Sequence, residues 1–260
     1  MQNKDNTYKG YVTRVEPERR FGFIETESGC SYFFFIDNTE QIQRKKLGLT
    51  DKIHKFCSGD EVEFQIRTSP KDPNKNEAYN LIFIRNERRQ KLIDEAKLSD
   101  SLLGYIKMID NETFFIKHIS TYVFIPLSIS AWETDFDEVY YKRIDKLVNF
   151  RLIQTHKIDQ LKAVLTDVKF LPEYYELQSA ISSDLILTAT ITGKNSKGLF
   201  AEILNRRIEG FIPISKNPND LELLKFEKLR KGCEAQVRVK YIFDNKKVSL
   251  ILVNDDDKTV

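Results

Sequence analysis

Apolar residues recur at every second position in much of this chain. Clear examples are the runs at 8–12, 62–66 and 235–239. Alternation with a period of two puts the apolar side chains on one face of a short β-strand. The pattern therefore predicts a protein built mainly from strands.

Two stretches break this alternation. Between 86 and 99 the apolar residues follow a helical spacing among many charges, and between 171 and 184 a proline precedes a short run of helical character. Both are expected to connect domains. The predicted organisation is a first domain at 1–87, a linker helix at 88–98, a middle domain at 99–177 and a C-terminal domain at 178–260.

Each predicted domain has the same outline of five short strands with a longer connection after the third. This outline is typical of the OB-type Greek-key barrel, which binds oligonucleotides across its second and third strands. The middle domain fits it more loosely, and its connection at 128–145 is expected to contain a short helix. The predicted fold is mainly β, with three consecutive five-stranded OB-type barrels joined by short, partly helical linkers. The expected strands lie at 8–15, 20–26, 31–36, 60–67 and 78–84, at 102–109, 112–117, 121–126, 147–155 and 161–169, and at 185–193, 197–203, 207–213, 233–242 and 246–253.

The first domain contains four phenylalanines in two neighbouring strands. Alternation places Phe21 and Phe23 on one face of a strand, and Phe33 and Phe35 on one face of the next. These rings are either part of the core or an exposed platform for bases. The opposite face already supplies enough apolar residues to line a small barrel, namely Ile24, Tyr32, Phe34 and Ile36. This favours the platform.

The same strands resemble a known family. RRFGFI at 19–24 and YFFFI at 32–36 are similar to the two ribonucleoprotein motifs of the cold-shock domain, which read like KGFGFI and VFVHF. The likeness covers about 8–84. It implies that the four phenylalanines stack on the bases of single-stranded nucleic acid.

Four positions depart from the cold-shock pattern. Arg14 and Val15 stand where the family has a tryptophan and a phenylalanine, Phe35 stands where it has a histidine, and Ile36 replaces an aromatic residue. A guanidinium can stack on a base or pair with a phosphate, so Arg14 is kept among the predicted binding residues.

Basic residues flank the predicted platform. Arg19 and Arg20 are expected to contact phosphates at its rim. The run Arg44, Lys45 and Lys46 is interpreted first as a solvated loop, with a phosphate contact as the alternative.

The C-terminal domain resembles the S1 RNA-binding domain over about 184–253. The runs that carry the likeness are LTATITGKNSKGLFAEILNRRIEGFIPISK and RKGCEAQVRVKYIFDNKKVSLIL. At the positions that stack on bases in that family, Phe200 and Phe211 are aromatic, whereas Lys197 and Pro213 stand where phenylalanine and histidine are frequent. The resemblance therefore implies a binding face with fewer rings.

An excess of basic residues in this domain is expected to offset the loss of stacking rings. Lys197 and Arg238 are the predicted phosphate contacts, and a solvated surface is the alternative for any single residue. The acidic tail at 255–257 is expected to be disordered. The basic residues are Lys194, Lys197, Arg206, Arg207, Arg238, Lys240, Lys246 and Lys247.

The middle domain carries no motif of comparable strength. It is predicted to be a spacer between binding domains. Its aromatic and histidine residues within expected strands are Phe114, His118, Tyr122 and Phe124. Burial is expected for the rings of its long connection, Trp132, Tyr140 and Tyr141.

Composition limits the remaining classes. The formal net charge is only +2, so any nucleic-acid contact must come from local patches and stacking. The three cysteines lack metal-ligand spacing, and no apolar segment is long enough to span a membrane. We expect a cytoplasmic protein with no metal, no cofactor and no membrane association.

Catalytic motifs are also missing. The chain has no Walker loop, no GxSxG, no HExxH and only three isolated histidines. Its domain order is similar to the RNA-binding parts of bacterial processive exoribonucleases, without room for their catalytic domain. An enzyme is not expected.

The sequence thus predicts a non-catalytic protein that binds single-stranded RNA by stacking and phosphate contacts. An RNA chaperone or a regulator of translation or RNA decay fits this prediction, and single-stranded DNA stays open as a ligand. The alternative class is a protein-interaction scaffold of OB domains that have lost nucleic-acid binding. The residues do not identify a protein partner.

Overall fold

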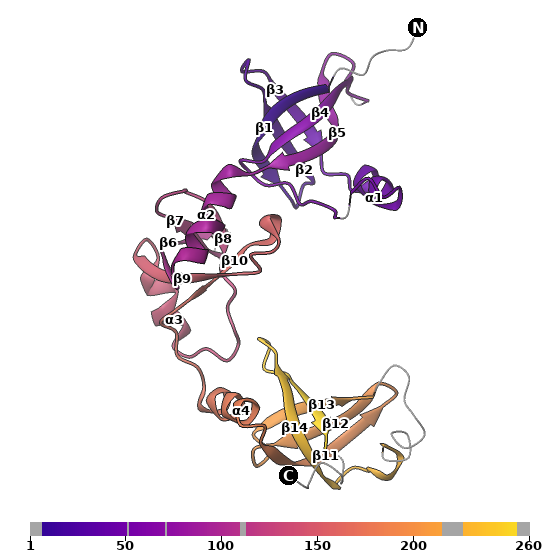
Figure 1. The fold of residues 1–260 in the computed structure, drawn as a ribbon, viewed down its shortest axis with the longest axis vertical. Helices are drawn as coiled ribbons and strands as arrows, with labels where there is room; N and C mark the ends of the chain where they lie inside the picture. The colour runs from indigo at the N-terminus through magenta and orange to yellow at the C-terminus, as the bar shows by residue number, and fades with distance from the viewer. Residues whose placement is uncertain (1–6, 51, 71, 110–112, 215–225, 254–260) are drawn as a thin grey trace. The chain divides into compact units, whose positions relative to one another are not determined.

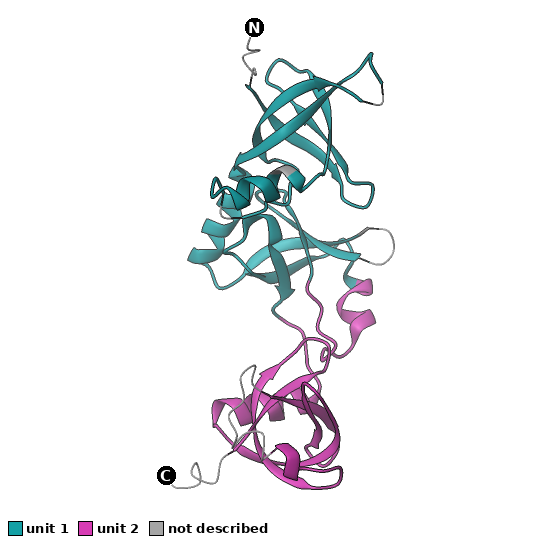
Figure 2. Ribbon diagram, turned by 90° about the vertical axis from the view of Figure 1, so that its right-hand side faces the viewer, with its two compact units in different colours: residues 1–127, 143–166 teal, residues 128–142, 167–260 magenta. Residues whose placement is uncertain are grey.

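The computed structural model describes residues 7–50, 52–70, 72–109, 113–214 and 226–253. The protein is mainly β, as predicted, and its strands form two closed barrels and one curled sheet. It divides into two compact units (Figure 2). Unit 1 consists of 1–127 and 143–166, and unit 2 of 128–142 and 167–260. The acidic tail at 255–257 lies outside the described residues.

The first barrel has the strand order β1-β2-β3-β5-β4 (Figure 1). It closes through a parallel pairing of β3 with β5, in which Phe34 is opposite Ala78. Phe34 and Phe64 are completely buried in its core. This is the Greek-key pairing expected of an OB-type barrel. Its strands are β1 (Thr7–Glu16), β2 (Phe21–Glu25), β3 (Ser31–Phe35), β4 (Glu61–Thr68) and β5 (Asn76–Arg85).

The connection after β3 contains helix α1 (Thr39–Lys46). The interpretation of 44–46 as a loop is therefore wrong, because these basic residues form the last turn of α1. Cations are favourable near the negative end of a helix dipole, which explains a basic run at this position. Arg44 also donates a hydrogen bond to Oδ1 of Asn80 at 2.7 Å.

Helix α2 (Glu87–Leu98) follows the first barrel, at the place where the sequence predicts a helix at 88–98. The side chain of Asn86 caps it by accepting a hydrogen bond from the backbone N–H of Arg89 at 3.0 Å. The same side chain donates to Oδ1 of the buried Asp60 at 2.7 Å. The barrel and the helix are thus joined by a buried polar contact.

The middle sheet has the order β10-β9-β6-β7-β8. Among the described residues its edges meet in one parallel bridge, Leu127 with Ala163, so it is a curled half-barrel, which agrees with the looser OB-type fit expected for this domain. Strand β8 is only three residues long and ends at Pro126, which has no N–H for a ladder. The strands are β6 (Leu102–Ile109), β7 (Thr113–His118), β8 (Phe124–Pro126), β9 (Leu147–Ile153) and β10 (Lys162–Leu165).

Unit 1 combines the first barrel, α2 and the middle sheet. The Arg89 guanidinium donates to the carbonyl of Ile158 at 2.8 Å, and the backbone N–H of Lys55 donates to Oδ2 of Asp159 at 3.0 Å. Ile158 and Asp159 lie in a 3-10 turn (Ile158–Gln160) that precedes β10. These contacts join the barrel to the middle sheet.

The C-terminal barrel is closed in the order β11-β12-β13-β15-β14. Helix α4 (Pro172–Ser182) precedes it and buries Leu177 and Ala180 against its core. The predicted boundary between 177 and 178 falls inside this continuous helix. The strands are β11 (Ile186–Asn195), β12 (Gly198–Ile203), β13 (Ile208–Pro213), β14 (Glu234–Ile242) and β15 (Val248–Leu252).

The connection at 128–142 belongs to the same unit as this barrel. It contains helix α3 (Phe136–Val139), which confirms the expected short helix. Trp132 is completely buried in the core of unit 2, and its indole N–H donates to the carbonyl of Phe243 at 2.8 Å. Tyr140 is buried as expected, whereas Tyr141 is exposed.

Candidate nucleic-acid interface

Strands β2 and β3 bring the four predicted phenylalanines together. Phe21 is directly opposite Phe35, and Phe23 is opposite Phe33. The ring centroid of Phe33 lies 5.4 Å from that of Phe21, 5.7 Å from that of Phe23 and 4.7 Å from that of Phe35. We call these four rings the platform.

The platform lies on the outer face of the barrel. Its rings are partly or well exposed, while Ile24 and Phe34, their neighbours in the chain, are completely buried. Tyr32 and Ile36 pack against the buried core, as the alternation predicts. The core is therefore filled without the platform.

Glycine at position 22 makes this arrangement possible. A Cβ atom there would lie 2.5 Å from the buried Phe34 ring and 2.7 Å from the carbonyl oxygen of Arg14. No side chain fits in that space, so the glycine between Phe21 and Phe23 allows β2 to pack directly over the core.

Three arginines lie on β1 and in the turn that leads into β2. Arg14 is opposite Phe23, and its guanidinium pairs with Glu16 at 2.5 Å. Arg19 and Arg20 are exposed in the turn between β1 and β2. The Arg20 carbonyl accepts a hydrogen bond from the N–H of Ile36 at 2.9 Å, which fixes this turn beside the ends of β2 and β3.

The C-terminal barrel repeats the arrangement with two rings. Phe200 on β12 is opposite Phe211 on β13, with centroids 5.2 Å apart. Gly193 is the cross-strand neighbour of Phe200 on β11, so no side chain covers that ring from this strand. Lys197 is exposed in the β11–β12 turn, where its backbone N–H donates to Oδ1 of Asn195 at 2.8 Å.

Arg238 is not brought next to these two rings. It is opposite Ile251 on β15, whereas Phe211 is opposite Ser249 of the same strand, so β15 separates the two side chains. Arg238 also pairs with Asp184 at 3.3 Å. Arg238 is therefore a poorer candidate for a phosphate contact than Lys197.

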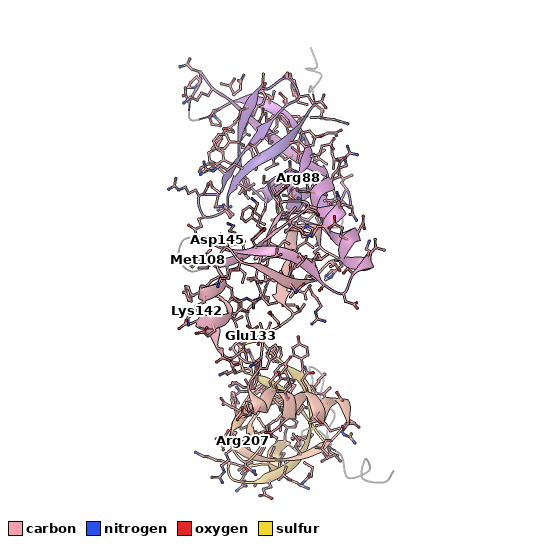
Figure 3. All side chains as sticks on the ribbon, turned by 90° about the vertical axis from the view of Figure 1, so that its left-hand side faces the viewer. Arg88, Met108, Glu133, Lys142, Asp145 and Arg207 are labelled. Atoms are coloured by element: carbon pink, nitrogen blue, oxygen red, sulfur yellow. The ribbon has the colours of Figure 1, made fainter. Side chains whose placement is uncertain are left out.

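Arg207, which is labelled in Figure 3, lies in the turn before β13. It pairs with two acidic residues of α4. Its guanidinium lies 2.6 Å from Glu176 and 3.2 Å from Glu173. Hydrogen bonding to the Glu176 carboxylate raises the pKa of Arg207. This arginine stabilises α4 on the barrel and is a poor candidate for a phosphate contact.

An aromatic pair that the sequence analysis did not single out lies on β14 and just after it. Tyr241 and Phe243 are exposed, and their ring centroids are 4.7 Å apart. Tyr241 is opposite Ser249, which is in turn opposite Phe211. The alternation of Tyr241 and Phe243 in a lysine-rich turn is the signal that could have identified them.

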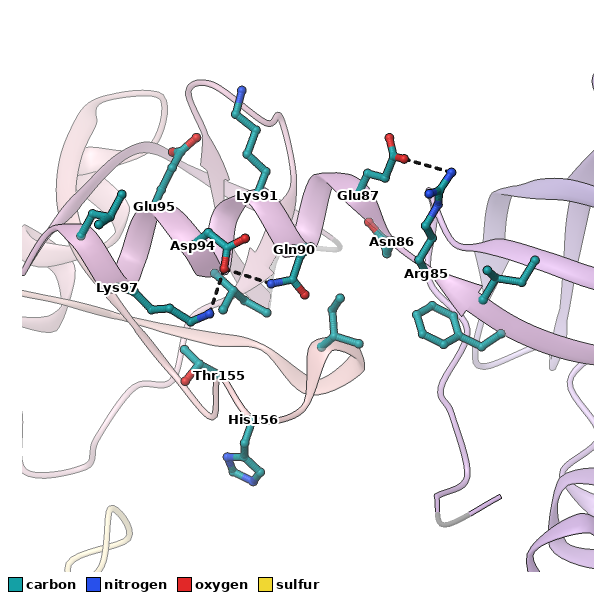
Figure 4. Close-up of a pocket in the computed structure, with 15 residues that line it drawn as sticks. Arg85, Asn86, Glu87, Gln90, Lys91, Asp94, Glu95, Lys97, Thr155 and His156 are labelled. Carbon is teal, nitrogen blue, oxygen red and sulfur yellow. Dashed lines mark hydrogen bonds and ion pairs between the residues drawn. The ribbon is translucent and has the colours of Figure 1, made fainter. Parts of the chain in front are cut away.

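A cavity of about 960 Å³ lies beside α2 (Figure 4). Its charges balance, with three basic side chains and three acidic ones. Lys97 pairs with Asp94 at 2.8 Å and Arg85 with Glu87 at 3.1 Å. A polyanion gains little from such a surface.

Among the residues that the structure describes, no group of three or more His, Cys, Asp and Glu side chains could hold a metal ion. Within the described ranges, no helix is both long enough and apolar enough to cross a membrane.

Comparison with protein families gives one match. Residues 182–252 match the S1 RNA binding domain. This range contains all five strands of the C-terminal barrel and confirms the S1 resemblance. It supports nucleic-acid binding in general terms. The resemblance of the first barrel to the cold-shock domain stays a prediction.

Several solved structures are distantly similar. A multidomain protein with nucleic acid binding domains from Streptococcus pneumoniae is 16% identical, covers 96% of this chain and 74% of its own, and has a TM-score of 0.22. Drosophila Unr CSD456 is 15% identical over 96% of this chain and 98% of its own, with a TM-score of 0.24. Mycoplasma genitalium RNase R is 12% identical over 59% of this chain and 21% of its own, with a TM-score of 0.20. No curated protein matches the sequence. These likenesses are too distant to assign a function.

Proposed function

We propose that this chain is a non-catalytic, single-stranded RNA-binding protein whose principal site is the platform of the first barrel. One observation carries the proposal: four phenylalanine rings contact one another on the outer face of a barrel that is filled without them. A cluster of exposed rings is unfavourable in water unless a ligand covers it. Unpaired bases are such a ligand.

The platform favours stacking over sequence readout. Each base stacked on an aromatic side chain contributes about 1–3 kcal/mol, and every base offers a π-face. Arg19, Arg20 and Arg14 would contact the phosphates between stacked bases. Binding would therefore depend on single-strandedness more than on sequence.

The C-terminal barrel would add a second contact through Phe200, Phe211 and Lys197. Two sites on one chain raise the effective concentration of a bound strand at the second site. Because the protein would hold bases unpaired, it would shift RNA away from duplex. This activity suits an RNA chaperone or a regulator of translation or decay.

A protein-interaction scaffold is the second candidate. The observation that favours it is that Arg14, Arg207 and Arg238 each pair with an acidic residue of the same chain. Such pairs lower the positive potential available to phosphates. Direct binding measurements separate the two candidates.

Fluorescence anisotropy of labelled oligo-U, oligo-dT and an RNA duplex against the whole protein, at two salt concentrations, tests the proposal. The variant carries Phe33→Ala and Phe35→Ala. The matched control is Tyr11→Thr, which removes another exposed ring of the first barrel, one that lies opposite Glu25 and Glu61. These acidic neighbours make Tyr11 a poor phosphate-side contact.

We expect single-strand binding that weakens with salt and falls by about tenfold or more in the double variant, since each stack is worth at least about 1 kcal/mol. The control should bind like the wild type. Oligo-U and oligo-dT compared directly report whether a 2′-hydroxyl contributes. Absence of binding to every oligonucleotide by folded protein would reject the proposal in favour of the scaffold.

A further inference from the structure

The outer face of the middle sheet carries aromatic and basic side chains in rows across three strands. Tyr105 on β6 is opposite Lys117 on β7, and Lys117 is opposite Phe124 on β8. The adjacent row pairs Lys107 with Phe115. Side chains that face each other on one side of a sheet lie about 5 Å apart. These residues therefore form one continuous surface.

The rings of this surface are not needed for the core. Tyr105 is 41% exposed and Phe124 is 44% exposed. Ile106, Ile116 and Ile125 lie on the opposite face of the same strands and are completely or almost completely buried. As in the first barrel, the aromatic face is separate from the face that stabilises the fold.

A third ring is held over this face by a fixed turn. Tyr122 is 64% exposed and has a φ of +57°, a conformation that a bulky residue rarely adopts. Two hydrogen bonds hold the turn in place. The Tyr122 N–H donates to the carbonyl of His118 at 3.1 Å, and the His118 ring is hydrogen-bonded to the Thr121 hydroxyl at 3.0 Å. Ser120 donates to the Glu95 carboxylate at 3.0 Å. Backbone strain that is maintained in this way is common at binding sites.

A lysine lies between the rings. Nζ of Lys117 is 5.3 Å from the ring centroid of Tyr122 and 5.8 Å from that of Phe124. A hollow of about 640 Å³ opens beside it, lined by Tyr105 and Tyr122 among others. The charged side chains that line the hollow are Lys107, Lys117 and Asp145. Lys107 pairs with Asp145, so the hollow carries the net positive charge of Lys117.

We propose that this face is a further base-stacking site for single-stranded RNA, in addition to the platform and the rings of the C-terminal barrel. Bases would stack on Tyr105, Tyr122 and Phe124, and Lys117 would contact the phosphate between them. The proposal rests on the proposed function of the chain and extends it to the middle sheet, which the sequence predicted to be a spacer. The positive charge of Lys117 lies between the rings and is not neutralised within the hollow. This favours a nucleic acid, with its phosphates, over an apolar protein surface as the ligand.

The test uses the whole protein and a series of oligo-U lengths, from about 4 nucleotides to about 32, which spans the range from less than one OB fold to two. The variant carries Tyr105→Thr, Tyr122→Asn and Phe124→Thr. Threonine suits strands, and asparagine tolerates a positive φ, so the replacements keep the backbone preferences. A second variant, Lys117→Glu, keeps all three rings. Circular dichroism and thermal melting check that both fold, and Tyr11→Thr is the matched control.

We expect the shortest oligomer that binds to show the same affinity for both variants and the wild type, because the platform is intact. Longer oligomers should bind the wild type more tightly than the shortest one does. Both variants should bind these longer oligomers about fivefold or more weakly than the wild type, since one stacked base contributes about that much. Equal affinity of folded variants and wild type at every length would overturn the site on the middle sheet and leave the proposed function standing. No binding by the wild type at any length would overturn both.

Discussion

Phe33 and Phe34 are consecutive residues of β3 that point to opposite faces of the first barrel. Phe33 contacts the three other rings of the platform, whereas Phe34 is completely buried and packs edge-on against Phe56. Two neighbouring substitutions should therefore have opposite effects. Phe34→Ala should lower the free energy of unfolding by about 3–5 kcal/mol, as for other buried phenylalanines. Phe33→Ala should cost much less stability and lose RNA affinity instead.

Urea unfolding and oligo-U binding on the same two variants check this contrast. Phe34→Ala is measured for binding below its unfolding transition, where it should retain affinity. Equal losses of stability in both variants would contradict the assignment of the two faces.

Trp132 is predicted to stabilise the C-terminal barrel although it precedes β11 by more than fifty residues. Its indole ring is buried in the core of unit 2 and donates to Phe243. Trp132→Ala should cost unit 2 about 3–5 kcal/mol, because a large ring and a hydrogen bond are both lost. Hydrogen exchange followed by mass spectrometry should show faster exchange in β11–β15 and unchanged exchange in β1–β5. The control is Tyr141→Ala, whose ring is exposed in the same connection. Unchanged protection of β11–β15 would refute this role.

Substitution of Asp60 should strongly lower the free energy of unfolding of unit 1. It is 1% exposed and accepts hydrogen bonds from Asn86 at 2.7 Å and from the N–H of Cys57 at 2.8 Å, while it pairs with His54 at 2.8 Å. Asp60→Ala leaves all three groups without this partner, so unfolding should become easier by about 3 kcal/mol or more.

Urea unfolding measures this loss, with Asp72→Ala as the control in an exposed turn where Asp72 pairs with Lys75. Because Asn86 also caps α2, the first turn of α2 should exchange its amide protons faster in Asp60→Ala. A loss no larger than that of the control would show that the buried contacts contribute little.

The stability of unit 1 should fall in mild acid. Burial lowers the pKa of His118 below its ordinary value of 6.5, against an opposing effect of the Glu95 carboxylate and with a smaller lowering effect of Lys91. A histidine with a lowered pKa binds fewer protons in the folded state than in the unfolded state. Its stabilising contribution is therefore complete above the unfolded pKa and is lost as pH falls through the folded pKa.

Urea midpoints between about pH 8 and about pH 5 report this dependence. His118→Gln should be less stable at high pH and should show a flatter pH profile. His156→Gln, at an exposed position, should leave the profile unchanged. A wild-type midpoint that rises toward pH 5 would give the opposite sign and reject the explanation.

Much of the first barrel could be predicted because its alternation is regular. The period of two predicts that Phe21 and Phe23 lie on one face of β2 and Ile24 on the other. The structure places all three side chains in this way. The S1 resemblance likewise singled out Phe200 and Phe211, which the structure places opposite each other on β12 and β13. Local order and spacing are sufficient where neighbouring strands are joined by short turns.

The middle sheet could not be interpreted in the same way. Lys117 lies between the aromatic residues of this face, so the sequence of β7 does not show the pattern of a platform. Aromatic residues that are close in sequence also lie on opposite faces of the sheet. Phe114 and His118 are buried, whereas Tyr122 and Phe124 are exposed. The position of Trp132 depends on a carbonyl more than a hundred residues away, which no local pattern encodes.

Photo-crosslinking locates the bound bases on the protein and so shows whether the platform is the principal site. Oligo-U that contains 5-bromouridine is bound to the whole protein, irradiated and digested with trypsin, and the crosslinked peptides are sequenced by mass spectrometry. All four rings of the platform fall in one tryptic peptide, residues 21–44. We predict that this peptide carries the principal crosslink and loses it in the variant with Phe33→Ala and Phe35→Ala. A principal crosslink elsewhere, unchanged in that variant, would contradict this prediction.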